Sequence, residues 1–344
     1  MSEPTTLDNK IIFSAIKPTG ELTLGNYIGA LRNWTELSKR CLCYYAVADL
    51  HAITIDMEAA ELRNRSLDLF AMFIALGLNP EKNVLFVQSH VSAHAELTWV
   101  LNCFTQFGEA RRMTQFKDKS QKRPENVNVG LFDYPVLQAA DILLYNADYV
   151  PIGKDQQQHL ELSRTIAERF NNRYSPTFTV PEGVYPKYGA KVFSLADPSA
   201  KMGKSEDDPN GCVFLSDDPD TVLRKVRRAV TDSETVIRYD PAKKPGVSNL
   251  LTIYASMAKV TVKAAEAEFI SKSYVELKEK TAAAIIETLR PLNETFKKLR
   301  ADKAYLTNLM CKGAEKATNT AYKTLSKVYR KVGFVANCQR PIKE

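Results

Sequence analysis

The architecture of this chain follows first from residues 10–30, which read KIIFSAIKPTGELTLGNYIGA. The segment opens with an apolar run typical of a buried strand, which Pro18 and Gly20 end. Apolar residues then recur at positions 27, 28, 31 and 34, which is the spacing of one face of a helix. We therefore predict a strand, a tight turn and a helix.

The same alternation continues further along the chain. Two more apolar strands are expected at residues 43–53 and 83–91, with an amphipathic helix between them at residues 58–76. This order predicts an α/β fold with a Rossmann-like, doubly wound parallel sheet. Ligands of such sheets bind beyond the carboxyl ends of the strands. We therefore expect the site near residues 13–20, 49–54 and 88–90.

The character of the sequence changes after residue 215. Helical patterns follow at residues 220–230, 250–260, 262–290 and 313–332. A stretch rich in Pro, Gly, Asp and Ser precedes them. We expect a Rossmann-type catalytic domain at 1–200, a mobile loop and linker at 201–215, and an α-helical domain at 216–344. The last helix is expected to pack back on the catalytic domain.

Composition excludes several classes of protein. A hydrophobic content of 44% and a charged content of 25% are ordinary for a globular domain. No apolar run reaches the roughly 18 residues of a membrane span, and residues 1–10 lack the pattern of a signal peptide. The six cysteines show no paired metal spacing. We expect a reduced, cytoplasmic protein with no membrane partner.

The net charge of +7 is unevenly placed. Residues 281–344 hold 13 Lys and Arg against 5 Asp and Glu, so this region carries the whole excess. Basic helices suggest a polyanionic partner such as nucleic acid. A solvated helix face whose lysines serve solubility explains the charge equally well.

Two polar segments are candidates for nucleotide binding. In the turn at residues 18–30, Gly20 and Gly25 let a ligand approach the backbone, and the helix that follows favours an anion. The turn matches neither GxGxxG nor the P-loop pattern. The second segment is SAKMGKSEDD at residues 199–208, which is either a solvated loop or a clamp for phosphates.

Together these segments resemble the paired signatures of class I aminoacyl-tRNA synthetases, an HIGH-like turn and a KMSKS-like loop. The further match is to the bacterial type of tryptophanyl-tRNA synthetase, over roughly residues 10–335. It rests on residues 49–54, on RMTQFKDKS at 112–120, on DYPVLQAADILLYNADYVPIGKDQQQHLEL at 133–162, and on RAVTDSE at 228–234 and KPGVSNLL at 244–251.

The resemblance implies a homodimer that activates L-tryptophan with ATP and transfers it to tRNA(Trp). Mg²⁺ would arrive bound to ATP, without a metal site on the protein. Because the substrate carboxylate is already ionised, its attack on the α-phosphorus needs no general base. It needs positioning, and positive charge on the leaving pyrophosphate. The lysines of the second segment are then phosphate ligands.

Individual residues acquire roles from the same resemblance. The catalytic charges would be Lys119, Lys201 and Lys204. ATP would contact Lys17, Thr23, Gly25, Asn26, Gly153, Asp155, Met202 and Ser205. Tryptophan would be held by Phe13, His51, Tyr134, Gln138, Asp141, Val150, Ile152 and Gln156. Asp141 would accept the indole N–H, a bond that phenylalanine cannot make. Tyr134 and Gln156 would hold the ammonium group. From the residue alone, a helix residue in a salt bridge is the favoured interpretation of Asp141.

Four positions depart from the family pattern. Gly203 stands where the loop usually has serine, and Lys17 where glutamine is usual. Lys154 replaces a common glutamate next to Asp155, and Gln138 replaces a methionine of the indole pocket. Our hypothesis is that the two lysines alter ATP binding and that Gln138 alters the fit of inhibitors.

Alternatives remain at this stage. A tyrosine-specific relative is the nearest enzyme, although the segment around Asp141 is of the tryptophan type. A catalytically impaired synthetase paralogue that acts as an RNA-binding or regulatory protein is the other. His90 and His94 lie four residues apart, but no third ligand for zinc stands at a suitable spacing.

Overall fold

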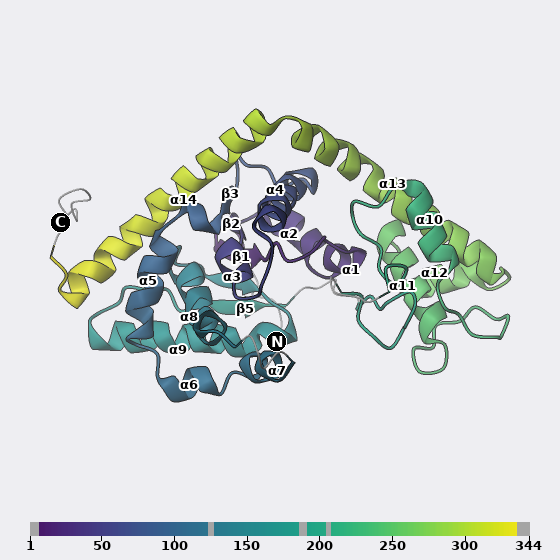
Figure 1. Ribbon diagram of the computed structural model, residues 1–344. Helices are drawn as coiled ribbons and strands as arrows, with labels where there is room; N and C mark the ends of the chain where they lie inside the picture. The colour runs from purple at the N-terminus through teal and green to yellow at the C-terminus, as the bar shows by residue number, and fades with distance from the viewer. Residues whose placement is uncertain (1–6, 123–126, 186–190, 204–207, 336–344) are drawn as a thin grey trace.

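The computed structural model describes residues 7–122, 127–185, 191–203 and 208–335. Its centre is a five-stranded parallel sheet with the order β3-β2-β1-β4-β5 (Figure 1). The strands are β1 Ile11–Ile16, β2 Leu42–Val47, β3 Val84–Val87, β4 Tyr149–Pro151 and β5 Glu182–Val184. The predicted Rossmann-like fold is confirmed. The strand order reverses between β1 and β4, and this crossover point is where such sheets bind ligands.

The strands are buried on both faces because helices cover both. Along β2, Cys43, Tyr45 and Val47 belong to one hydrophobic cluster, whereas Tyr44 and Ala46 belong to the other. The first cluster contains side chains of α2 (Arg32–Leu37) and α4 (Ala59–Ala75), and it continues into the helical region after residue 215. The second contains side chains of α5 (Ala93–Asn102), α8 (Val129–Leu143) and α9 (Gln157–Arg173). This burial explains why the strands read as continuous apolar runs.

The helices of the sheet region begin with a continuous helical segment after β1. It comprises α1 Leu24–Asn26, a π-helical turn Tyr27–Leu31 and α2 Arg32–Leu37. The others are α3 Asp49–Ala52, α4 Ala59–Ala75, α5 Ala93–Asn102, α6 Phe107–Arg111, α7 Thr114–Lys122, α8 Val129–Leu143 and α9 Gln157–Arg173. Short 3-10 helices span Gln88–His90 and Lys154–Gln156.

The helical region contains α10 Pro219–Arg227, α11 Pro245–Ala258, α12 Val262–Phe269, α13 Tyr274–Ala301 and α14 Lys303–Val332. The single helix predicted over 262–290 is wrong, because the chain breaks between α12 and α13. Ser273 caps the second helix: its side chain accepts from the Glu276 backbone N–H, and Glu276 accepts in return from the backbone of Ser273.

Two strand predictions were too long. The run predicted at 43–53 leaves the sheet after Val47 and forms α3, and the run at 83–91 leaves it after Val87. Asp49 explains the first change, since it accepts from the backbone N–H groups of Leu50 and Ser89 and so joins both strand ends. Such bonds favour a turn over a continued strand.

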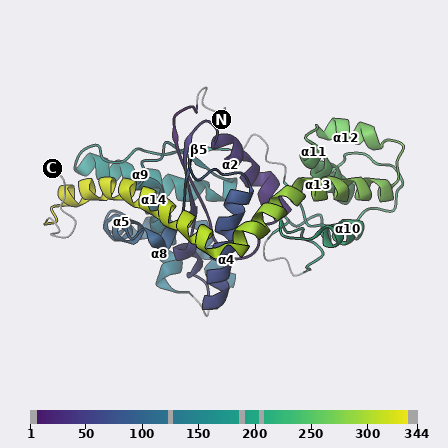
Figure 2. The same ribbon diagram turned by 90° about the horizontal axis from the view of Figure 1, so that it is seen from above.

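The last two helices form an arch over the molecule, from the helical region back across the sheet (Figures 1 and 2). α14 packs against the edge strand β3 and against α5. The closest approach is at Gly313, where a Cβ would lie 1.7 Å from the carbonyl oxygen of Leu85. Only glycine fits this crossing. In the described part of the chain, no helix combines the length and the apolar character needed to cross a membrane.

Candidate active site

A cavity of about 400 Å³ opens beyond the carboxyl ends of β1 and β4, at the crossover point of the sheet. Its walls come from β1, α3, α7, α8 and β4. All eight residues predicted for the tryptophan pocket line it: Phe13, His51, Tyr134, Gln138, Asp141, Val150, Ile152 and Gln156. Segments that lie far apart in the sequence are therefore brought together at one place, as the fold rule predicts.

Asp141 is the buried charge of this cavity, with an exposed fraction of 1%. Its Oδ1 accepts from Gln88 Nε2 at 2.7 Å and from His94 Nδ1 at 2.6 Å. Its Oδ2 accepts from His51 Nε2 at 2.7 Å. His94 in turn lies 2.8 Å, through Nε2, from the hydroxyl of Tyr145. Three donors therefore hold the carboxylate in one orientation.

These contacts also fix its charge. Burial by itself raises the pKa of Asp141, but the charge of His51 and the hydrogen bonds from His51 and His94 lower this pKa well below its usual range. Asp141 is therefore an ionised hydrogen-bond acceptor at neutral pH. The described contacts give Oδ2 one hydrogen-bond donor, so this oxygen can accept a further hydrogen bond.

A second polar group of the cavity is centred on Tyr134. Its hydroxyl donates to Gln115 Oε1 at 3.2 Å and lies 2.8 Å from His159 Nε2. Burial raises the pKa of Tyr134, so the phenol stays neutral. Gln115 also donates to the backbone oxygen of Asp155 at 3.2 Å, and thus α7 is joined to the turn after β4.

The turn before α1 meets the segment that holds Met202. Thr23 Oγ1 accepts from the Asn26 backbone N–H at 3.1 Å, and Asn26 Oδ1 accepts from the Thr23 N–H at 3.1 Å. A Cβ placed on Gly25 would lie 3.2 Å from the backbone oxygen of Met202. Residues 22–24 also pair with residues 213–215 through backbone hydrogen bonds. The two predicted nucleotide segments are therefore in contact.

The remaining predicted ATP contacts lie at the ends of β1 and β4. Gly153 precedes the 3-10 turn Lys154–Gln156, and Asp155 lies within this turn, where its Oδ2 accepts from Gln156 Nε2 at 2.9 Å. Lys17 follows β1 and lines the cavity, and burial lowers the pKa of its amine. The side chain of Lys154 is outside the described part of the structure.

Of the three predicted catalytic lysines, only the Lys201 side chain is described. Its residue forms an antiparallel bridge with Phe193, and the side chain is exposed. Lys119 belongs to α7, but its side chain is outside the description. Lys204 and Ser205 lie outside the described residues altogether. At Gly203, a Cβ would come no closer than 3.6 Å to the Lys201 oxygen, so serine would fit there.

Sequence reasoning missed three residues of the site. Gln88 and His94 bind Asp141, and Gln115 lines the cavity. The only signal was that Gln88 lies in the expected 88–90 part of the site and Gln115 in RMTQFKDKS. His94 was weighed as a zinc ligand, yet both of its ring nitrogens are engaged by Asp141 and Tyr145. Among the described residues, no cluster of three His, Cys, Asp or Glu could hold a metal ion.

Comparison with known proteins identifies the family. The family model described as tRNA synthetases class I (W and Y) matches residues 7–290. This chain belongs to that family. This chain is 52% identical to a curated relative named tryptophan–tRNA ligase, from Clostridium perfringens. The match extends over 326 residues, which cover 95% of this chain and 98% of the relative.

Solved structures agree with the sequence matches. The synthetase is similar to tryptophanyl-tRNA synthetase from Mycoplasma pneumoniae, with a TM-score of 0.85 and 35% identity over 95% of this chain and 98% of the other. It is also similar to the Campylobacter jejuni enzyme complexed with ADP and tryptophan, with a TM-score of 0.83 and 30% identity over 94% of this chain and 100% of the other. The resemblance inferred from the sequence motifs is confirmed.

Proposed function

We propose that this chain is a tryptophan–tRNA ligase. It converts L-tryptophan and ATP to tryptophanyl-adenylate and pyrophosphate, and then transfers tryptophan to the 3′-terminal ribose of tRNA(Trp). The observation that carries the proposal is the oriented, ionised Asp141 in a cavity of about 400 Å³ with walls that include Phe13, Val150 and Ile152. An indole is flat and apolar with one N–H donor, so one acceptor in an apolar pocket matches it.

Roles within the cavity follow from chemistry and position. Asp141 Oδ2 accepts the indole N–H, because among the described contacts Oδ1 already accepts two hydrogen bonds and Oδ2 only one. Tyr134 and Gln156 lie on the same cavity and orient the substrate ammonium group. Lys17, which follows β1, adds positive charge near the substrate carboxylate and the ATP phosphates.

ATP binds where the Thr23–Asn26 turn meets the Met202 segment. Gly25 lets this turn lie against the Met202 backbone, and the start of the helical segment favours phosphate. Gly153 and Asp155 contact the ribose. Attack of the tryptophan carboxylate on the α-phosphorus forms the acyl–phosphate bond and releases pyrophosphate. Lys119, Lys201 and Lys204 stabilise the charge on that leaving group.

Mg²⁺ accompanies ATP in this proposal and adds positive charge at the phosphates. The described polar side chains that line the cavity are a lysine, amides, hydroxyls, the His51 imidazole and one carboxylate, which is hydrogen-bonded to His51 and His94. They do not form a dedicated metal site. The Mg²⁺ ligands are therefore expected to be phosphate oxygens and water.

The partner of the second step is tRNA. Residues 281–344 carry the excess of basic residues in the sequence, and the part of this range up to Val332 belongs to α13 and α14, which form the arch between the helical region and the sheet (Figure 1). Contacts between lysines and phosphates are salt-dependent and independent of sequence. The proposed cellular location is the cytoplasm, where tRNA is charged.

A second copy of the chain is the proposed partner of an exposed apolar patch. We define this dimer patch as Ile53, Trp99, Phe107, Val127 and Val129, whose exposed fractions range from 43% to 80%. The segments that carry these residues are joined by hydrogen bonds: Asn102 of α5 donates to Asp133 of α8, and Asn128 donates to the backbone oxygen of Thr54. Exposed apolar patches on globular proteins mark interaction sites.

The test of the ligase is transfer of labelled tryptophan to tRNA(Trp), with ATP and Mg²⁺. The account predicts charging by the wild-type protein, no charging with tyrosine, and loss of charging when Lys201 is replaced by alanine. An impaired paralogue would bind tRNA without charging it. A tyrosine enzyme would charge tyrosine instead. Either result would overturn the proposal.

A further inference from the structure

The segment that holds Lys201 is a short antiparallel hairpin, residues 192–202. Its strands are joined by hydrogen bonds from Ser194 N–H to the Ala200 oxygen at 2.9 Å and from Met202 N–H to the Val192 oxygen at 3.0 Å. Phe193 and Lys201 face each other between these bonds. In such a pair, the N–H and C=O groups of each residue point away from the partner strand. The outer backbone groups of Phe193 therefore need partners from elsewhere.

Asn249 of α11 supplies both partners. Its Oδ1 accepts from the Phe193 N–H at 2.9 Å, and its Nδ2 donates to the Phe193 oxygen at 2.9 Å. The side chain is buried, with an exposed fraction of 4%. A carboxamide has one acceptor and one donor side, as a peptide group does. The Asn249 carboxamide thus binds the outer edge of the hairpin as the backbone of a neighbouring strand would.

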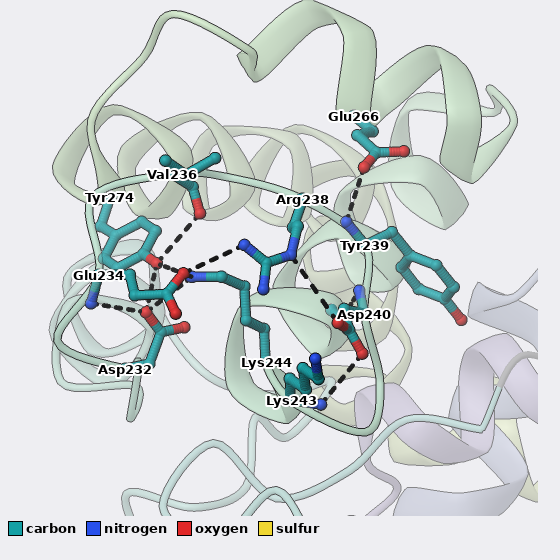
Figure 3. A network of polar contacts seen from close by, with 11 residues as sticks. Asp232, Glu234, Val236, Arg238, Tyr239, Asp240, Lys243, Lys244, Glu266 and Tyr274 are labelled. Atoms are coloured by element: carbon teal, nitrogen blue, oxygen red, sulfur yellow. Dashed lines mark hydrogen bonds and ion pairs between the residues drawn. The ribbon is translucent and has the colours of Figure 1, made fainter.

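The start of α11 is itself held in place by a buried cluster. The Lys244 amine, with a side-chain exposed fraction of 1%, binds Asp232, Glu234 and Tyr274, each at 2.9 Å (Figure 3). Because Asp232 and Glu234 belong to the segment between α10 and α11, the lysine ties that segment to the first turn of α11. The helix end therefore has little freedom to shift relative to the segment before it.

A second contact joins this cluster to the hairpin. The Val230 N–H donates to the Leu195 oxygen at 2.8 Å. At Gly246, a Cβ would lie 2.1 Å from the Val230 oxygen and 3.5 Å from Pro198. The first turn of α11 is therefore packed directly against the backbone that holds the hairpin, and only glycine permits this approach.

The other side of the hairpin meets the nucleotide turn. Met202 is buried, and its backbone oxygen lies close to Gly25, as described above. Asn249, Phe193, Lys201, Met202 and Gly25 thus form one continuous series of contacts from the helical region to the nucleotide turn. A shift of Phe193 would move Lys201, which is its direct partner across the hairpin.

We propose that Asn249 is a positioning residue of the activation reaction, which holds Lys201 and Met202 against the Gly25 turn through Phe193. The inference rests on the proposed function, because Lys201 is assigned there to pyrophosphate. Asn249 does not touch the reacting atoms. A displacement of about 1 Å in a reacting group can lower a rate by about 100-fold.

The experiment compares N249A and N249D with T252V. N249A removes both bonds to Phe193, and N249D keeps the acceptor but places a carboxylate against the Phe193 oxygen. T252V is the matched control, since Thr252 is also buried on α11 and its hydroxyl donates to Ser248 one turn earlier, on the same helix. Tryptophan-dependent exchange of pyrophosphate into ATP gives kcat and both KM values, and active-site titration corrects for inactive protein.

The proposal predicts that N249A lowers kcat by about 10- to 100-fold and raises the KM for ATP. The Kd of tryptophan, measured without ATP, should stay within about twofold, because the cavity does not include the hairpin. N249D should lose at least as much activity as N249A, because a buried carboxylate oxygen then faces the Phe193 oxygen, and T252V should match wild type. In a K201A background, N249A should cause little further loss, since it acts through Lys201.

Equal kinetics of N249A and T252V, or an equally large loss from N249A in the K201A background, would overturn the proposal. If the wild-type protein itself shows no exchange, the proposed function fails instead. Hydrogen-exchange mass spectrometry then still tests the contact. N249A, but not T252V, should exchange faster over residues 192–202, and unchanged protection in N249A would contradict the positioning role.

Discussion

Asp141 is the residue on which substrate choice depends. Its carboxylate is buried and accepts hydrogen bonds from Gln88, His94 and His51. When a substrate without an N–H donor occupies the cavity, this buried acceptor has neither water nor the substrate as its partner. The resulting free-energy penalty disfavours the binding of such substrates. The histidines and the glutamine contribute by keeping the acceptor ionised and oriented.

The first prediction concerns pH. Because the pKa of Asp141 is lower in the folded chain than in the unfolded one, its contribution to stability is present above about pH 4 and is lost as the pH falls below that value. D141N lacks this contribution. At pH 7 the variant should be less stable by at least about 1 kcal/mol. Urea unfolding between pH 7 and pH 3 should show the difference shrinking, and a constant difference would contradict the account.

A second prediction concerns Gln138, which lines the cavity at a position where the family resemblance leads us to expect methionine. An amide on an apolar wall costs free energy when a ring covers it without a hydrogen bond. Q138M should therefore bind tryptophan and indole-ring inhibitors more tightly, by about 3- to 10-fold. Equilibrium titration of both ligands checks this. Unchanged affinity for both would show that Gln138 has no part in ligand fit.

Residue roles were only partly predictable from the sequence. The resemblance placed eight residues on one cavity, and the structure brings all eight together. It did not indicate that Gln88 and His94 bind Asp141, because these residues lie 53 and 47 positions away in the chain. Periodicity describes contacts within one element, whereas these contacts join three elements at the end of a sheet.

At the scale of elements, the apolar patterns predicted which segments are strands and helices but not where they end. The run at 43–53 stays apolar into α3, since Ala48 and Ala52 are buried as the strand is. Burial alone therefore did not distinguish the strand from the helix that follows it. The side-chain bonds of Asp49 ended the strand, and such bonds depend on Ser89, which belongs to another segment.

Gly313 gives a prediction for the crossing of α14 and β3. In G313A, the added Cβ would overlap the Leu85 oxygen, so the helix must move away from the sheet edge. We expect a loss of about 1–3 kcal/mol in the free energy of unfolding. Denaturant unfolding measures it. G29A is the control, because a Cβ at Gly29 meets nothing within 4 Å. Equal stability of the two variants would contradict the close packing.

At the scale of the whole molecule, α13 and α14 connect the helical region to the far side of the sheet (Figure 2). The hydrophobic cluster on one face of the sheet continues into the helical region, so the two parts share a core. The proposed tRNA surface and the proposed activation site are therefore linked by packed elements. The Asn249 contact lies within this connection.

The dimer patch gives the prediction at this scale. W99E should convert the chain from dimer to monomer at micromolar concentration, because a carboxylate would be buried without a partner. Light scattering coupled to size-exclusion chromatography checks the mass. V275E is the control, since Val275 is exposed to 63% on the helical region, away from the patch. A monomeric wild-type protein, or a dimeric W99E, would rule out this interface.

The most direct measurement of the central claim is pyrophosphate exchange with tryptophan, tyrosine and β-(3-benzothienyl)alanine, in which sulfur replaces the indole N–H. The wild-type protein should prefer tryptophan over the sulfur analogue by at least about 100-fold in kcat/KM, since the analogue leaves Asp141 unpaired. D141N should lose most of this preference. Equal rates with tryptophan and its analogue in the wild-type protein, or faster exchange with tyrosine, would contradict the assignment of Asp141 as the group that selects tryptophan.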